Sequence, residues 1–119
     1  MQHKNTVWLV LGALIVAVGA VHAAARRPGH VWGGDFAQYV HHAKNLVTGV
    51  PYAETGYLYH AKYPQIGPPT YPPVAAAVLA PVYWARGLDL EAMKTVMLGC
   101  FLVFLVAVFL CFRDELPLG

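Results

Sequence analysis

The sequence predicts an all-α membrane protein in which two transmembrane helices flank an external loop that carries juxtamembrane helices. Of its 119 residues, 58% are hydrophobic and only 12% are charged, which is outside the usual composition of soluble domains. Long apolar runs lie near both ends of the chain, and a segment rich in tyrosine and proline lies between them. We therefore treat residues 1–119 as a single membrane region.

The first apolar run, residues 7–25, contains no charged side chain apart from the titratable His22. As a helix it would be about 28 Å long, close to the thickness of the hydrocarbon layer, so it is predicted to span a membrane. A cleaved signal peptide is the alternative, because Lys4 precedes the run and Val21-His22-Ala23 has small residues at the cleavage-type positions 21 and 23. Arg26-Arg27 directly after that site disfavour cleavage, and we favour an uncleaved anchor.

The second long run, residues 95–112, is also free of charge and is predicted to span, with a helix that begins near Leu90. A shorter apolar helix is predicted at residues 73–86, because Pro73 suits a first helical position and Gly87 a stop. At roughly 20 Å it is too short to cross comfortably. We favour a juxtamembrane helix there, and a short third span is the alternative.

An amphipathic helix is predicted at residues 36–48, ending at Gly49. Its apolar positions recur at intervals of three and four: Phe36, Tyr39, Val40, Ala43, Leu46 and Val47. The opposite face is polar: Gln38, His41, His42, Lys44, Asn45 and Thr48. This pattern predicts a helix lying along the membrane surface, with Asp35 as its N-cap and both histidines in solvent.

Several functions are disfavoured by the sequence. His30 and His60 lack metal-ligand spacing, and Cys100 and Cys111 would lie roughly 16 Å apart on one helix, too far for a disulfide. A net charge of +2 is too small to argue for a nucleic-acid partner. The segment 52–71 is rich in tyrosine and proline, and its aromatic rings suit either a lipid headgroup layer or the face of a sugar.

Three parts of the chain together resemble a known family: residues 33–52, read Gly-Gly-Asp-Phe-Ala-Gln-Tyr-Val-His-His-Ala-Lys-Asn-Leu-Val-Thr-Gly-Val-Pro-Tyr; Tyr71-Pro72-Pro73-Val74; and Gly87-Leu88-Asp89. In this order they resemble the N-terminal region of the C-type membrane glycosyltransferases, from about Trp8 to Phe112. The resemblance implies transfer of a sugar from a polyprenyl-phosphate donor on the external face of a bacterial inner membrane.

The resemblance also implies site residues. The acid at the position of Asp35 contributes to the catalytic centre of the family, as a base or as a ligand of a divalent metal ion, whereas the bare sequence also fits a simple N-cap. Relatives carry a positive residue near the Pro-Pro pair, but this chain has Thr70-Tyr71-Pro72-Pro73 there. Lys62 is the nearest cation and is the candidate for binding the donor phosphate.

Members of this family have many spans, and two or three helices do not enclose a reaction cavity. We therefore expect an N-terminal part of a longer enzyme, whose remaining helices complete the site, and an inactive isolated chain. The alternative is a small non-catalytic membrane protein that assembles with partner helices through the small residues of its spans.

Orientation is predicted from the resemblance, against the distribution of charge. Residues 26–94 carry most of the basic side chains, and the positive-inside rule alone would place them in the cytoplasm. That rule holds for loops of up to about 60 residues, and this segment is longer. We therefore predict that residues 26–94 are external.

Overall fold

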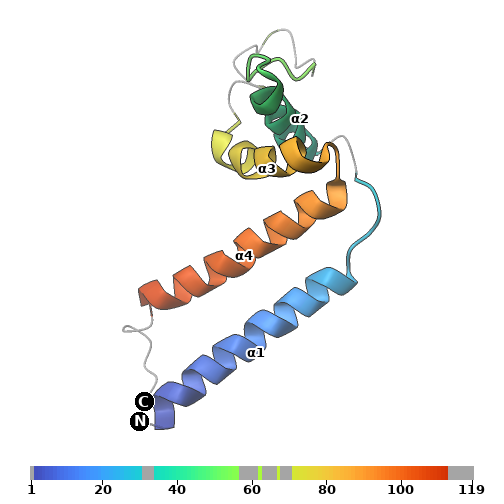
Figure 1. Cartoon of the computed structure of the whole chain (residues 1–119). Coiled ribbons are helices and arrows are strands. Elements are labelled where there is room, and N and C mark those ends of the chain that lie inside the picture. The colour runs from blue at the N-terminus through green and yellow to red at the C-terminus, as the bar shows by residue number, and fades with distance from the viewer. Residues whose placement is uncertain (1, 31–33, 57–61, 63–66, 68–70, 113–119) are drawn as a thin grey trace. The chain divides into compact units, whose positions relative to one another are not determined.

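A computed structural model of the chain contains four helices, α1 (Gln2–Ala24), α2 (Asp35–Thr48), α3 (Pro73–Arg86) and α4 (Leu90–Phe112) (Figure 1). The structure describes residues 2–30, 34–56, 62, 67 and 71–112, with side chains from Thr6 onward. Within these residues it is all-helical and contains no strand, which confirms the all-α part of the predicted class.

The helix boundaries follow the sequence signals closely. Helix α3 has the predicted bounds, α2 begins one residue earlier than predicted, and α4 begins at Leu90 as expected. Gly49 ends α2 in the left-handed conformation, with φ of 72°, and Gly87 ends α3 with φ of 65°. These positive φ values favour glycine at both positions.

The first turn of α4 has a cap that the sequence analysis did not single out. Asp89 Oδ1 accepts a hydrogen bond of 2.9 Å from the amide of Ala92, as an N-cap residue does. That backbone hydrogen bond, together with Arg86, lowers the pKa of Asp89, although partial desolvation acts in the opposite direction. The ionised carboxylate therefore stabilises the start of α4 at neutral pH.

The chain forms two compact units, one comprising Met1–Arg27 with Met97–Gly119 and the other Pro28–Val96. The first contains α1 and most of α4, while the second contains α2, α3 and the first turns of α4.

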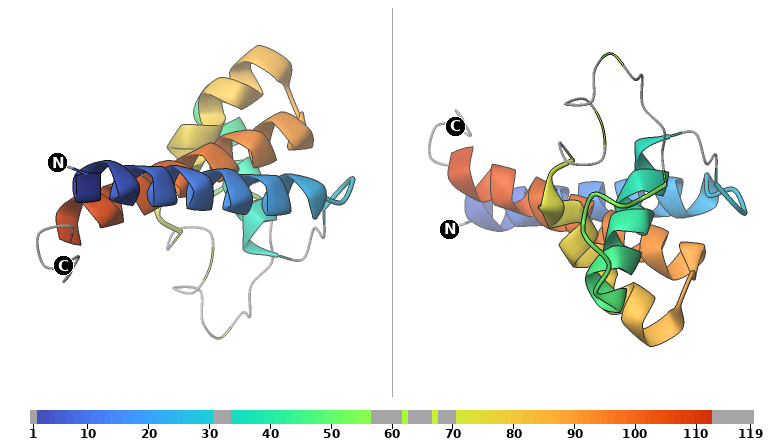
Figure 2. Two further views of the ribbon diagram at one scale, coloured as in Figure 1. Left: turned by 90° about the horizontal axis from the view of Figure 1, so that it is seen from below. Right: turned by 90° about the horizontal axis from the view of Figure 1, so that it is seen from above.

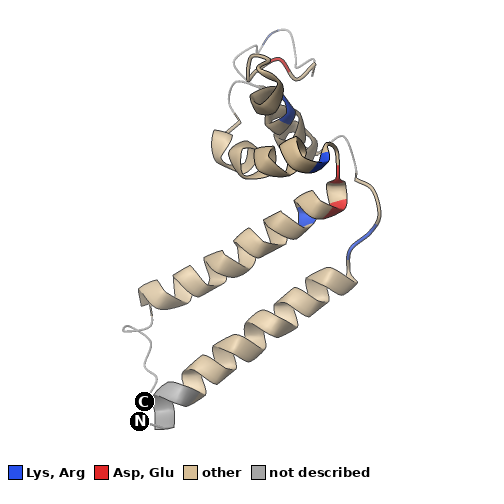
Figure 3. Cartoon of the chain, viewed as in Figure 1, with Lys and Arg blue, Asp and Glu red and all other residues tan. Residues whose placement is uncertain are grey.

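Two helical segments are long and apolar enough to cross a membrane, Thr6–Ala24 and Leu90–Phe112. None of the hydrophobic stretch of either is buried within the protein, so neither resembles the core helix of a soluble domain. In Figure 3 the coloured part of the α1 ribbon carries no charged residue, and the charged residues of α4 are confined to its first turns. Surfaces of this kind need a lipid environment or other apolar helices.

Within the first unit, α1 and α4 run in opposite directions and meet through a few ring contacts (Figure 2). Trp8 packs edge-on against Phe109 with ring centroids 5.4 Å apart, and His22 lies 5.5 Å from Phe101. His22 Nδ1 also bonds the carbonyl of Val18 at 3.0 Å. This bond keeps the imidazole against its own helix, which suits a polar group within an apolar span.

In the second unit, α2 packs directly against α3. The interior is small and is formed by alanines and a few larger apolar side chains, namely Ala37, Val40, Ala43, Ala76, Leu79 and Met93. The alanines allow the two helices to approach closely. This packing fixes one face of α2 and positions the residues considered below.

We expect α3 to leave its two ends on the same side of the membrane. With Cys100 and Cys111 replaced by alanine, Thr48→Cys and Leu88→Cys should both react with an impermeant thiol reagent added to one side of sealed vesicles, because both positions are exposed. Labelling of the two cysteines from opposite sides would instead establish α3 as a third span.

Candidate functional site

Asp35 is the first residue of α2, not its N-cap. The N-cap is Gly34, whose backbone is extended, and no side chain caps the helix. The prediction that Asp35 is the N-cap is therefore wrong by one position. The physical reason is that its carboxylate has another partner: Tyr71 donates its hydroxyl hydrogen to Asp35 Oδ1 at 2.8 Å.

The carboxylate of Asp35 is exposed at the end of the α2–α3 unit. Its second oxygen, Oδ2, has no hydrogen-bond partner among the described residues. The carboxylate lies at the N-terminal end of α2, which is the positive end of the helix dipole. Asp35 thus combines one oxygen that is held by Tyr71 with another that is available to a ligand.

Tyr71 is itself positioned by two other tyrosines. Its carbonyl accepts a hydrogen bond of 3.0 Å from Tyr52 Oη, and the edge of its ring meets that of Tyr39 with centroids 5.5 Å apart. Burial, together with the neighbouring Tyr39, raises the pKa of the Tyr52 phenol above its usual value. Tyr52 is therefore a hydrogen-bond donor at neutral pH.

His42 positions Tyr52 in turn. The two rings stack with centroids 3.9 Å apart and planes 12° from parallel, and His42 Nδ1 lies 2.7 Å from the carbonyl of Tyr52. Because a carbonyl can only accept, Nδ1 must carry the hydrogen. The side chain of His42 is 0% exposed, so the prediction that it is a solvated surface histidine is wrong.

Asn45 closes the same arrangement from the next turn of α2. Its Nδ2 group lies within bonding distance of three carbonyls, those of Pro51 at 3.2 Å, Tyr52 at 3.4 Å and Glu54 at 2.9 Å. The segment after α2 therefore folds back over the helix face that we predicted to be polar and exposed. Its carbonyls need donors, and buried side chains of α2 supply them.

Gln38 extends this buried polar face by one turn toward Asp35. It is 1% exposed, yet neither its amide nitrogen nor its amide oxygen has a partner among the described residues, and the same holds for His42 Nε2. Positions 38 and 42 are neighbours on one helix face. The sequence predicted this face to be solvated, so buried Gln38 is a second correction.

The structure does not bring the other predicted site residues to Asp35. Lys62 is exposed, and no described contact joins it to Asp35. No group of three histidine, cysteine or acidic side chains suited to a metal occurs within the described part of the chain. Both cysteines are free, as expected. His60 and the tyrosines at 57, 59 and 63 lie outside the described residues.

A separate pocket lies between α2 and α3, with a volume of about 180 Å³. It is lined by Val40, His41, Lys44, Tyr83 and Leu88. Burial lowers the pKa of His41, and Lys44 and His42 lower it further. No sequence motif predicts this pocket. The only signal is that His41 and Lys44 are three residues apart on a helix, a spacing that places two basic side chains on one surface.

A larger groove of about 630 Å³ lies where α3 meets the first turns of α4. Arg86 and Asp89, which both line it, form an ion pair at 3.4 Å, and Glu91, which also lines it, pairs with Lys94 at 2.9 Å. Lys94 also donates to the carbonyl of Gly29 at 2.7 Å. These groups bond one another and the backbone, so they stabilise the turn between α3 and α4.

No family model, curated protein or solved structure matches the chain.

We expect Asn45→Ala to loosen the segment that positions Tyr52. The change removes the donor shared by three carbonyls and should lower the local stability by about 1–3 kcal/mol. Amide hydrogen exchange should therefore become faster at Glu54 and Thr55, whose amides are bonded within this segment. The matched control is Leu46→Ala on the exposed side of α2, and equal acceleration in both variants would contradict a specific role for Asn45.

Proposed function

We propose that this chain is the N-terminal part of an integral-membrane glycosyltransferase that moves a sugar from a polyprenyl-phosphate donor to an acceptor on the external face of the bacterial inner membrane. The observation that carries the proposal is the exposed carboxylate of Asp35, bonded to Tyr71 at 2.8 Å, in a segment between two helices able to span a membrane. The order of motifs that resembles the C-type family supports it.

The proposed chemistry uses the two oxygens of Asp35 differently. Oδ1 is held by Tyr71, and Oδ2 takes the proton from the acceptor hydroxyl. The acceptor oxygen then bonds to the anomeric carbon, while the bond from that carbon to the phosphate oxygen breaks. Polyprenyl phosphate leaves with the electron pair, so atoms and charge balance.

A divalent metal ion is a further part of what the resemblance implies, but the described residues do not by themselves make its site. They supply one exposed carboxylate at Asp35 and no group of three suitable ligands. The proposed reaction therefore uses only side chains of this protein. Lys62 remains the proposed contact for the donor phosphate.

The remaining helices of the enzyme have a definite task in this proposal. Asp35 is exposed at the surface of the α2–α3 unit, whereas glycosyl transfer needs a site from which water is excluded. Further helices would cover this surface and hold donor and acceptor together. We expect the 119 residues alone to be inactive.

A second function is assembly with partner membrane helices, without catalysis. It is supported by Gly12 in α1 and Gly99 in α4, where no other side chain lies within 4 Å of the position a Cβ would take. Small residues of this kind allow close approach of another helix in a membrane. Whether the wild-type protein transfers sugar distinguishes the two functions.

We expect Asp35→Asn, made in the full-length protein, to slow sugar transfer by about a hundredfold or more. The amide oxygen can still accept the hydroxyl of Tyr71, so the local arrangement is kept while the basic carboxylate is lost. Transfer should be measured with membranes that contain equal amounts of variant and wild type.

The matched control is Glu54→Gln, which neutralises another exposed acid of the same unit and should transfer at the wild-type rate. Asp35→Ala also removes the partner of Tyr71, so comparing it with Asp35→Asn separates lost basicity from lost positioning. Near wild-type transfer by Asp35→Asn would exclude a catalytic role for Asp35, whereas absence of transfer by the wild-type protein would favour the assembly function.

The proposed orientation has its own test. In intact cells, Thr48→Cys in the background lacking Cys100 and Cys111 should react with an impermeant thiol reagent, because Thr48 is exposed on α2. If the reagent labels it only after the membrane is disrupted, the segment is cytoplasmic and the proposed external reaction is wrong.

A further inference from the structure

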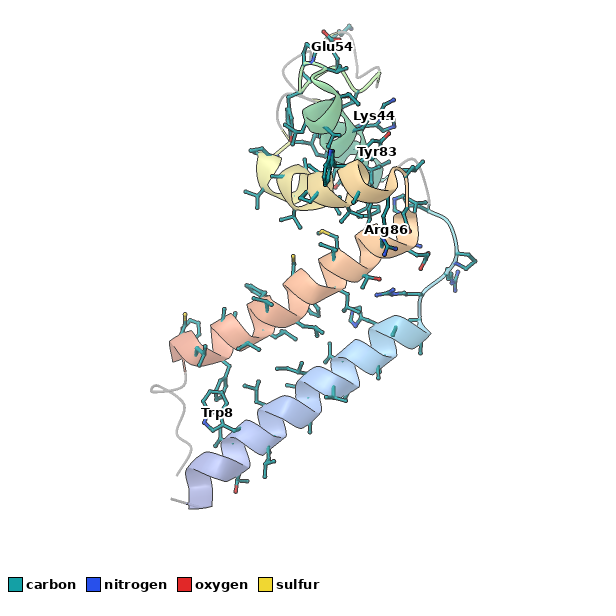
Figure 4. The ribbon with its side chains drawn as sticks, viewed as in Figure 1. Trp8, Lys44, Glu54, Tyr83 and Arg86 are labelled. Atoms are coloured by element: carbon teal, nitrogen blue, oxygen red, sulfur yellow. The ribbon has the colours of Figure 1, made fainter. Side chains whose placement is uncertain are left out.

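The pocket between α2 and α3 combines a cation, a phenol and an apolar floor. Lys44 on α2 and Tyr83 on α3 contribute the polar groups, and Val40 and Leu88 contribute apolar surface. Figure 4 shows the side chains of Lys44 and Tyr83 on the same side of the helix pair. A ligand that fits this lining has an anionic group next to aliphatic carbon.

The charge of Lys44 is not neutralised within the described part of the chain. No carboxylate there forms an ion pair with it, in contrast to Arg86 and Lys94, which pair with Asp89 and Glu91. Tyr83 Oη likewise has no hydrogen-bond partner among those residues. Two donors with unused bonding capacity therefore line one pocket.

The pocket also lies beside the start of an apolar helix. Leu88, which forms part of its lining, precedes Leu90, the first residue of α4, by two positions. It is about 10 Å along the chain from Thr95, where the uncharged stretch of α4 begins. Headgroup layers extend roughly 5–7 Å beyond the hydrocarbon, so a membrane crossed by α4 would place Leu88 close to its headgroups.

We propose that this pocket binds the phosphate group of an anionic phospholipid, with Lys44 Nζ and Tyr83 Oη as donors. Val40 and Leu88 contact the glycerol and the first acyl carbons. The proposal depends on α4 crossing a membrane but not on sugar transfer. A free phosphate would leave the apolar floor unused, whereas a lipid headgroup uses both parts of the lining.

Lys44 carries most of the positive charge of this site at neutral pH. The pKa of His41 is lowered by burial and by Lys44 and His42, so its imidazole is largely neutral. Removal of the single charge of Lys44 should therefore have a measurable effect.

The test uses the full 119-residue chain in neutral detergent, titrated with phosphatidylglycerol and followed by native mass spectrometry. Lys44→Gln should bind the lipid about fivefold more weakly than wild type, the effect expected of one basic side chain at an anionic lipid surface. Lys44→Arg should retain most of the binding, and phosphatidylcholine should bind equally to all variants.

Arg27→Gln is the matched control, because it removes one positive charge from an exposed position that does not line the pocket. Circular dichroism should show unchanged helix content in each variant. If Lys44→Gln and Arg27→Gln weaken binding equally, the lipid is attracted by general charge alone, and the proposed site is wrong. Inorganic phosphate should be added as a competitor. If it displaces the lipid from wild type but not from Lys44→Gln, at concentrations similar to those at which the lipid binds, the site binds free phosphate and the proposed lipid occupant is wrong.

Discussion

The arrangement around Asp35 depends on the hydrogen bonds that α2 gives to the carbonyls of the segment following it. Asn45 and His42 hold the backbone at Tyr52, the hydroxyl of Tyr52 holds the backbone of Tyr71, and Tyr71 reaches Asp35. Each contact joins residues far apart in sequence or on different segments. The position of the carboxylate is thus decided by buried polar side chains two to three turns away on its own helix.

This dependence explains which features could be predicted from the sequence. Helix ends are set by local chemistry, and Pro73, Gly49 and Gly87 mark them because ring geometry or a positive φ acts at a single position. The two apolar runs could be predicted for a similar reason, since their length and lack of charge are properties of the sequence itself.

The inner face of α2 could not be predicted in this way. Periodicity placed Val40 and Ala43 on an apolar face expected to rest on the membrane, whereas both are buried within the protein. It also assigned Gln38, His42 and Asn45 to solvent, and all three are buried. A pattern of apolar residues predicts which apolar side chains are buried. These polar side chains are buried for another reason, namely that backbone carbonyls fold over them and accept hydrogen bonds from His42 and Asn45. The fold-back is a tertiary event, so hydropathy alone carries no signal for it. The fold-back also explains why Tyr71 is hydrogen-bonded to the carboxylate of Asp35, which was expected to cap α2.

Helix α2 links the two proposed sites without making one depend on the other. Asp35 and Lys44 are nine positions apart, about 14 Å along the helix axis, which is far beyond hydrogen-bond reach. Both need the packing of α2 on α3, because Tyr83 belongs to α3 and Tyr71 lies just before its first residue. A change in the buried alanines would disturb both, whereas a change in either exposed side chain acts on one. The α2–α3 pair can therefore contact a lipid headgroup through Lys44 and leave the carboxylate of Asp35 available for a second ligand.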